Sequence, residues 1–269
     1  MKKSALVTGA SRGIGEEVAR RLAASGYKVF LAARSLGRLQ ALAQELNETG
    51  GQAEAVKLDL QEKESIVKCA EKVEEHCAGD LGVLINNAGY GIYGRVDQVS
   101  LKAARQLFEV NYFGALELTL ELLSVLESGA GGRVINVASG VAKRGFPVMS
   151  HYAASKAALE SISESMREEL RPRGIKVQVV YPLRTESGFS KAAQRFVPRG
   201  FSFPGHGPTQ SAEAVAGTIE RALEKNKFRI HPHYSTRLLG VLNELAPGLV
   251  ARILKFKETV LRSFGQADS

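Results

Sequence analysis

The chain has 269 residues, of which 44% are apolar, and its formal net charge is +8. This length fits one large α/β domain over residues 1–269, and the apolar runs are too short to span a bilayer. Two cysteines, Cys69 and Cys77, exclude a disulfide framework. We expect a reduced, cytoplasmic protein with no metal site, whose positive charge fits either anionic ligands or a solvated surface. The aromatic residues do not interleave with the basic ones, which disfavours nucleic-acid binding.

Short apolar strands alternate with amphipathic helices through most of the chain. Strands are expected at residues 4–8, 28–33, 53–58, 81–86, 133–138 and 175–181, with an edge strand at 228–231. Helices are expected at residues 14–24, 36–48, 63–77, 101–127, 150–170 and 211–225. The helix over 101–127 should bend near Asn111, because asparagine is an indifferent helix former. Apolar strands in this alternation predict a parallel sheet covered by helices on both faces.

A glycine-rich turn joins the first strand to the first helix. Residues 8–15 read TGASRGIG, with glycines at Gly9, Gly13 and Gly15. Glycines let the backbone approach a pyrophosphate, which then lies at the unpaired N–H groups of the helix N-terminus. An ordinary glycine turn is the alternative, but the order strand, turn, helix favours a dinucleotide phosphate site.

The end of the second strand indicates which dinucleotide binds. NAD-binding proteins place an acidic residue there for the ribose hydroxyls, whereas this chain has Ala33 followed by Arg34. A guanidinium offers a planar fork to a phosphate, and Arg12 in the glycine turn supplies a second cation. These residues predict NADP(H); two ordinary surface arginines are the alternative.

Three polar residues follow the strand expected at 133–138. Ser139 lies just past this strand, and Tyr152 and Lys156 lie in the first turns of the next helix. Residues four apart share a helix face, so we expect the Lys156 ammonium to lower the pKa of the Tyr152 phenol. Ser139 could hold a substrate oxygen. A tyrosine and a lysine at this spacing occur by chance on many helices, so the pair depends on its context.

Together, these motifs resemble the short-chain dehydrogenase/reductase family, in its single-domain, NADP-preferring branch. The resemblance rests on TGASRGIG at 8–15, NNAG at 86–89, Asn111, Ser139 and YAASK at 152–156. It implies a Rossmann-like, doubly wound parallel sheet of about seven strands. It also implies a homodimer or homotetramer built on the helices expected at 101–127 and 150–170.

The resemblance assigns roles to individual residues. Tyr152 is expected to be the general acid/base, with Lys156, Ser139 and Asn111 completing the catalytic group. The implied cofactor-binding residues are Gly9, Ser11, Arg12, Gly13, Ile14, Gly15, Arg34, Asp59, Leu60, Asn87, Ala88, Gly89, Tyr152, Lys156, Pro182 and Ser187. In one place the chain departs from the family, since Leu183 stands where a glycine commonly follows Pro182. Ser187 keeps the hydroxyl at the end of that motif, but the contacts there stay open.

The last third of the chain is the least like the family. Residues 183–210 are expected to form an irregular substrate loop. Residues 234–264 read as an amphipathic helical tail, broken near residues 247–248, with basic residues between apolar ones at helical spacing. Three places could cover the apolar face of this tail: the rim of the protein's own pocket, a partner subunit, or a membrane surface.

The residues and the resemblance together predict an NADP(H)-dependent oxidoreductase. We expect hydride transfer between the nicotinamide and a carbonyl or secondary alcohol, with a hydrophobic ketone or aldehyde as substrate, as in a carbonyl reductase. One alternative is a non-catalytic NADP-sensing protein on the same fold, and another is a 3-oxoacyl-thioester reductase. The tail leaves peripheral membrane contact as an open alternative to a purely cytoplasmic location.

Overall fold

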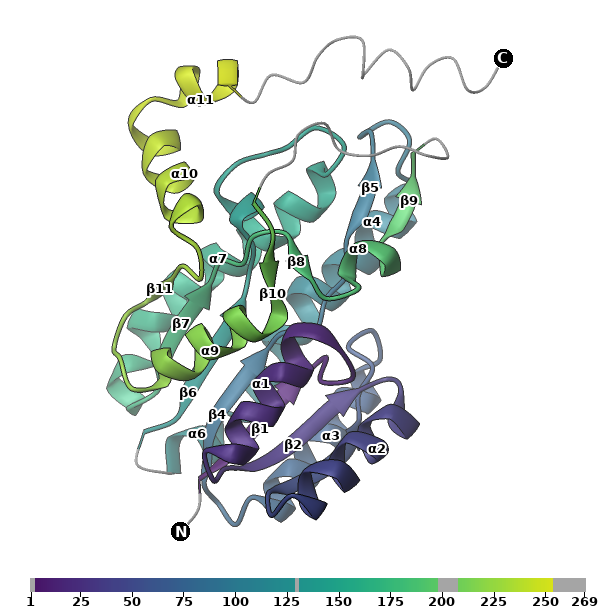
Figure 1. Cartoon of the computed structure of the whole chain (residues 1–269), viewed down its shortest axis with the longest axis vertical. Helices are drawn as coiled ribbons and strands as arrows, with labels where there is room; N and C mark the ends of the chain where they lie inside the picture. The colour runs from purple at the N-terminus through teal and green to yellow at the C-terminus, as the bar shows by residue number, and fades with distance from the viewer. Residues whose placement is uncertain (1–2, 129–130, 198–207, 254–269) are drawn as a thin grey trace.

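A seven-stranded parallel sheet forms the centre of the protein (Figure 1). The computed structural model describes residues 3–128, 131–197 and 208–253. The strand order is β11-β7-β6-β4-β1-β2-β3. These strands are β1 (Ser4–Thr8), β2 (Lys28–Ala33), β3 (Gln52–Lys57), β4 (Leu81–Asn86), β6 (Arg133–Val137), β7 (Lys176–Val180) and β11 (Arg229–Ile230). The predicted doubly wound sheet is confirmed, and no strand end differs from expectation by more than one residue.

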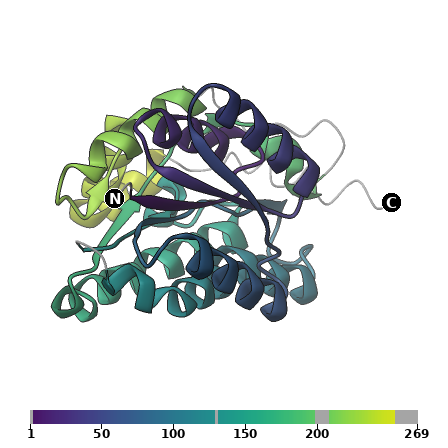
Figure 2. The ribbon, with the colours of Figure 1, turned by 90° about the horizontal axis from the view of Figure 1, so that it is seen from below.

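Helices cover both faces of the sheet (Figure 2). Side chains of α1 (Gly13–Ala24), α2 (Leu36–Glu48) and α9 (Ala212–Leu223) pack on one face in a single apolar cluster. The other face is covered by α3 (Lys63–His76), α5 (Gly114–Glu121), α6 (Leu123–Ser128) and α7 (Ser150–Glu169). Strands buried on both faces explain why they read as continuous apolar runs.

The long helix expected at 101–127 is divided by a π-helical turn. It begins as α4 (Leu101–Phe108), passes through η1 (Glu109–Phe113) and continues as α5. The irregularity falls on Asn111, as predicted, and the buried asparagine bonds to neighbouring segments instead of solvent. A π-turn inside an α-helix is frequent at functional sites.

The segment expected as an irregular loop at 183–210 contains several short elements. They are β8 (Thr185–Glu186), α8 (Phe189–Ala192), β9 (Gln194–Phe196) and β10 (Gln210–Ser211). β9 pairs with β5 (Ile92–Gly94), and β8 pairs with β10. Strands of two or three residues carry no periodicity of their own, so the sequence missed them. Residues 198–207 of the predicted loop lie outside the described residues.

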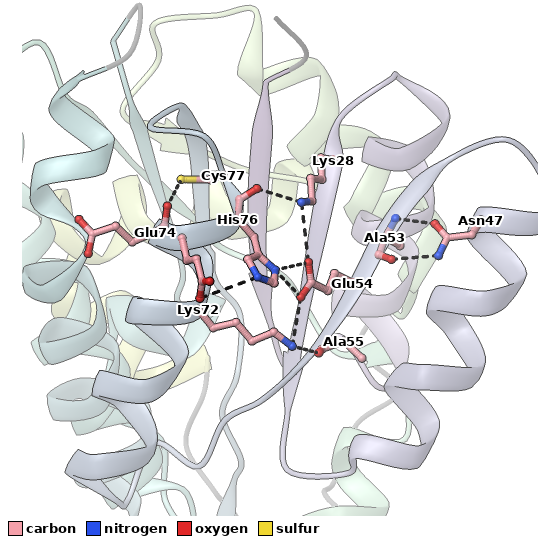
Figure 3. A network of polar contacts seen from close by, with 10 residues as sticks. Lys28, Asn47, Ala53, Glu54, Ala55, Lys72, Glu74, His76 and Cys77 are labelled. Atoms are coloured by element: carbon pink, nitrogen blue, oxygen red, sulfur yellow. Dashed lines mark hydrogen bonds and ion pairs between the residues drawn. The ribbon is translucent and has the colours of Figure 1, made fainter.

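A polar network holds the edge strand β3 to its neighbours (Figure 3). Glu54 on β3 accepts from His76 at 2.8 Å and pairs with Lys72 of α3 at 3.1 Å and Lys28 of β2 at 3.7 Å. Burial alone would raise the pKa of Glu54, but the hydrogen bonds and charges of His76 and Lys72 lower it. The network ties β2, β3 and α3 together on the side away from β1.

The described part of the tail is helical and interrupted where expected. α10 (Tyr234–Leu245) is followed by α11 (Pro247–Ile253), which starts at the proline. Asn243 of α10 donates to the Lys143 carbonyl at 3.0 Å and accepts from Arg144 at 2.5 Å. α10 therefore rests on the short helix η2 (Gly140–Lys143), which follows Ser139. The expected tail residues 254–264 lie outside the described residues.

Candidate active site

A groove of about 610 Å³ runs along the carboxyl ends of β1, β2, β3 and β4. Parallel strands bring the turns that follow them to one edge of the sheet, where open α/β sheets bind ligands. The structure brings eleven of the predicted cofactor residues together here. They are Gly9, Ser11, Arg12, Ile14, Arg34, Asp59, Leu60, Asn87, Ala88, Gly89 and Ser187.

The glycine turn leaves no space for side chains. A Cβ on Gly15 would lie 2.4 Å from the Gly9 carbonyl oxygen and 2.5 Å from Asn87 Nδ2. Gly9 and Gly13 both have positive φ, a conformation that glycine adopts without cost. The backbone of this turn is therefore exposed at the groove and held in one conformation.

Thr8 joins the glycine turn to the turn after β4. Its hydroxyl accepts the backbone N–H groups of Asn87 at 3.0 Å and Ala88 at 2.9 Å, and Asn87 Nδ2 donates to the Thr8 carbonyl at 2.8 Å. Because both turns share these hydrogen bonds, they form one rigid wall of the groove.

Three arginines line the groove: Arg12 in the glycine turn, Arg34 just after β2 and Arg38 in the first turn of α2. None has an ion-pair partner within residues 3–128, 131–197 and 208–253. The sequence analysis did not anticipate Arg38. Unpaired guanidinium groups beside a phosphate-sized cradle favour an extra phosphate on the ligand.

Asn111 organises the inner end of the groove. Its side chain accepts the Tyr90 N–H at 3.1 Å and donates to the Tyr90 carbonyl and the Ser155 hydroxyl, each at 3.0 Å. The Ser155 hydroxyl in turn donates to the Tyr152 carbonyl at 2.8 Å. The sequence reasoning missed Ser155, whose position within the YAASK motif was the only signal.

Tyr152 and Lys156 are buried side by side on α7, with exposed fractions of 6% and 3%. Lys156 Nζ donates to the Val137 carbonyl at 2.8 Å. Tyr152 belongs to an apolar cluster with Ile92, Val99 and Leu107, and its ring lies 5.5 Å from that of Phe189. The Tyr152 ring is therefore surrounded mainly by apolar side chains.

The pKa values correct one expectation about this pair. Burial raises the pKa of Tyr152, and a hydrogen bond with Ser139 only partly lowers it. Burial also lowers the pKa of Lys156 to about 8, so its ammonium is partly neutralised near that pH. The predicted lowering of the Tyr152 pKa by Lys156 is not found here, because burial raises this pKa and the Lys156 ammonium donates to the Val137 carbonyl.

The other predicted residues lie beside the groove. Ser139 accepts the Val141 N–H at 3.4 Å and so caps η2. Ser187 packs on the glycine turn, since a Cβ on Gly13 would lie 2.6 Å from Ser187 Cβ. Pro182 accepts the Gly140 N–H at 2.9 Å and is not part of the groove lining. Leu183 approaches the Gly140 position, so it packs under η2.

Neither a metal-binding cluster nor a membrane-spanning helix is found among the described residues. No group of three or more His, Cys, Asp or Glu side chains there could hold a metal ion. No helix in that part of the chain has both the length and the apolar character needed to cross a bilayer.

The known proteins that this chain resembles are dehydrogenases, reductases and oxidoreductases. A family model described as short chain dehydrogenase matches residues 3–197. The uncharacterized oxidoreductase YbbO of Escherichia coli is 34% identical over 255 residues, covering 93% of both chains. The ketoacyl reductase HetN of Nostoc sp. is 30% identical over 260 residues, covering 94% of this chain and 88% of its own. The structure of a short-chain dehydrogenase from Sphingobium yanoikuyae in complex with NADPH superimposes with a TM-score of 0.77 at 26% identity, covering 99% and 98% of the two chains.

Proposed function

The chain is an oxidoreductase that belongs to the short-chain dehydrogenase family, and from that premise we propose that it uses NADP(H) to interconvert a hydrophobic carbonyl compound and its secondary or primary alcohol. The observation that carries the proposal is the position of Tyr152. Its buried phenol lies near enough to Ser139 for that hydroxyl to lower the phenol pKa, and it belongs to an apolar cluster beyond a groove built from the turns after β1 and β4. A proton donor next to an apolar ligand space suits carbonyl reduction.

The groove fits a dinucleotide. The close contacts at Gly9 and Gly15 leave backbone N–H groups beside the N-terminus of α1, where a pyrophosphate binds favourably. Arg12, Arg34 and Arg38 would meet the extra phosphate of NADP(H), and no acidic residue stands at the end of β2. The solved relative in complex with NADPH agrees with this choice. Asp59 and Asn87 would flank the adenosine half.

When bound, the reduced nicotinamide supplies a hydride to the carbonyl carbon. The chain's own residues manage the proton and the orientation of the substrate. Tyr152 would donate its phenolic proton to the carbonyl oxygen, so that the carbonyl becomes an alcohol, and Ser139 would hold that oxygen by a hydrogen bond. Because burial raises the pKa of Tyr152, the phenol keeps its proton at neutral pH, as a donor for reduction requires. Lys156 and Asn111 would hold the nicotinamide ribose and a water path at the inner end of the groove.

The substrate class follows from the side chains around Tyr152. Val141, Met149, Phe189 and Phe196 pack against its cluster, so a ketone or aldehyde with an apolar body fits better than a charged sugar. A 3-oxoacyl thioester is a second candidate, favoured by the similarity to the ketoacyl reductase HetN. A protein that only senses NADP(H) is the remaining alternative, and it would not need the buried phenol.

We also propose a homodimer or homotetramer in the cytoplasm. The outer surface of the α4 and α5 region carries exposed Leu101, Phe113 and Leu120. They are spread along the continuous helical tract of α4, η1 and α5, and exposed large apolar side chains can mark a subunit interface. Sedimentation of the purified chain measures this directly.

The variant Tyr152→Phe tests the function. It removes one hydroxyl from a buried ring, so we expect NADPH binding and thermal stability close to those of the unaltered protein. Turnover of an apolar ketone or aldehyde should fall by about 10²–10⁴-fold, the range usual for a lost general acid. NADPH oxidation is measured against a panel of ketones, aldehydes and 3-oxoacyl thioesters, with Tyr112→Phe as the matched control. Near-native turnover in Tyr152→Phe would overturn the assignment, and no turnover of any substrate by the unaltered protein would favour the sensing alternative.

A further inference from the structure

Exposed apolar side chains are concentrated on the outer side of α10 and α11. Of the ten large apolar side chains that are exposed in the described chain, five lie here, each between 44% and 80% exposed. The first four follow one another at intervals of four, three and four residues, which places them along one face of α10, and the fifth lies on α11, after the break at Ala246. We call them the outer stripe: Tyr234, Leu238, Val241, Leu245 and Leu249.

The opposite face of α10 is already anchored to the protein. Thr236 is fully buried, and Gly240 packs against the Lys143 side chain. Asn243 makes its two hydrogen bonds to the Lys143 carbonyl and to Arg144. The outer stripe is therefore presented outward by a fixed helix, the reverse of an ordinary surface helix, whose outer face is polar. Figure 1 shows α10 and α11 standing at one edge of the molecule, beyond β11.

A cationic cavity of about 750 Å³ adjoins the outer stripe. Six basic side chains and one acidic side chain, Glu244, line it. The basic residues are Lys143, Arg221, Lys225, Lys227, Arg229 and Arg237. Tyr234 and Val241 belong both to the cavity lining and to the outer stripe, so the apolar and cationic surfaces are continuous.

Most of this positive charge is not neutralised by the protein. Lys143 is paired with Glu160, and Arg229 with Glu164. The other four cations have no ion-pair partner in the part of the chain that the structure describes. The electrostatic effect is visible at His231 in the cavity wall, whose pKa falls to about 4 because of burial and the charges of Lys143, Arg237 and Arg229.

Charge argues against two of the three possible occupants. In a two-fold dimer the same patch meets its own copy, so the cavities would bring like charges together. Residues 254–269 carry Lys255, Lys257 and Arg262 against Glu258 and Asp268, so this segment has no net negative charge with which to complement a cationic cavity. A partner with an anionic surface and an apolar interior would bind both the cationic cavity and the outer stripe.

We propose that the outer stripe and the cationic cavity dock the protein on an anionic membrane surface. Apolar side chains of an interfacial helix enter the acyl boundary while adjacent cations bind lipid phosphates. In this proposal the cavity binds the phosphate groups of lipids that belong to the bilayer. Because α10 rests on η2, docking would place η2 and the adjoining Ser139 on the side of the protein that faces the bilayer. The inference stands on this surface and does not require the proposed substrate.

Vesicle co-sedimentation of the full chain tests the proposal. The vesicles are phosphatidylcholine alone, or phosphatidylcholine mixed with phosphatidylglycerol. We expect binding to the mixed vesicles only, weakening as salt is raised. Leu238→Gln with Leu245→Gln, and separately Lys225→Gln with Lys227→Gln, should each reduce vesicle affinity by about tenfold or more. The substituted side chains are exposed, so melting temperature should be unchanged.

Matched controls change the same residue types elsewhere. Val96→Gln alters an exposed apolar side chain, and Lys3→Gln with Lys176→Gln alters two exposed lysines at the amino ends of the strands. Both controls should bind vesicles like the unaltered protein. The proposal is overturned if the chain ignores mixed vesicles or binds both vesicle types equally. It is equally overturned if the stripe variant changes the oligomeric state instead of vesicle binding, or if millimolar inorganic phosphate occupies the cavity while vesicles do not bind.

Discussion

The turns after β1 and β4 and the segments after β7 both lie at the carboxyl edge of the sheet, but they are held in different ways. In the first region, the glycine turn and the Asn87 turn interlock through backbone contacts and the Thr8 hydroxyl. In the second, β8 and β10 have two residues each, and α10 is attached by a few polar contacts with its outer face exposed. The first region admits almost no change of side chain, whereas the second can vary without disturbing the sheet. A cofactor site of fixed shape beside a variable substrate wall is the consequence.

One buried ion pair beneath the second region is as constrained as the glycine turn, and its loss gives the largest expected effect. Lys143 and Glu160 have side chains only 9% and 11% exposed, and Glu160 also accepts from the Tyr181 hydroxyl at 2.9 Å. Glu160→Ala leaves the lysine charge buried without a partner, which should lower the free energy of unfolding by about 3–5 kcal/mol. Urea denaturation measures it.

The matched control for that substitution is Glu164→Ala on the same helix. Glu164 pairs with Arg229 at a site where both side chains are nearly half exposed, so its loss should cost less than about 1 kcal/mol. Similar costs for the two variants would contradict the view that Glu160 anchors η2 to β7.

A methyl group in the glycine turn probes the rigid region. In Gly15→Ala the new Cβ meets the Gly9 carbonyl oxygen at 2.4 Å, so we expect a loss of about 3 kcal/mol in stability and weakened NADPH binding. Gly248→Ala in α11 is the control, because no atom lies within 4 Å of its Cβ position. Calorimetry and NADPH fluorescence titration report the two quantities. If Gly15→Ala and Gly248→Ala have the same stability and the same NADPH affinity, the two regions do not differ in how well they tolerate an added side chain.

The arginines that line the groove allow a test of cofactor preference in the rigid region. Arg34→Ala should reduce kcat/KM with NADPH by roughly tenfold, the low end for a charged hydrogen bond at an exposed site. The value with NADH should stay the same, which serves as the internal control. An equal loss with both cofactors would show that Arg34 shapes the turn and does not read a phosphate.

The smallest expected effect concerns the polar network on β3 shown in Figure 3. Glu54 is 24% exposed, so Glu54→Gln should cost only about 1 kcal/mol. The pKa of Glu54 is lowered from 4.5, so its stabilising contribution is present above about pH 4.5 and is lost as pH falls through the folded-state pKa. The stability difference between this variant and the unaltered protein should therefore shrink in acid. Glu64→Gln, on a fully exposed pair, should show no difference at any pH.

The two regions also differ in how far the sequence predicts them. The order of the main strands and helices, the glycine turn and the Tyr152–Lys156 pair follow from periodicity and motif spacing, whereas the grouping of Asn111 with that pair follows from the family resemblance. β5, β9, β8 and β10 do not, because each is stabilised by a partner distant in sequence. Nor could the sequence indicate that Lys156 bonds to the Val137 carbonyl, so it could not predict the pKa of Tyr152. The direction of that shift is set by burial, a property of the packed fold.

The contact between Ser187 and Gly13 has a thermodynamic consequence. The position next to Gly13 Cα is filled by a residue that is remote in the chain, so the phosphate turn and the segment leading to α8 share one boundary. A ligand that shifts the segment carrying Ser187 and Phe189 must change the free energy of the turn as well. Linkage requires the effect to be reciprocal: the factor by which a bound carbonyl compound alters cofactor affinity equals the factor by which the cofactor alters affinity for that compound. Any coupling between the two ligands would pass through the contact between Ser187 and the glycine turn, and its sign would be the same whichever ligand bound first.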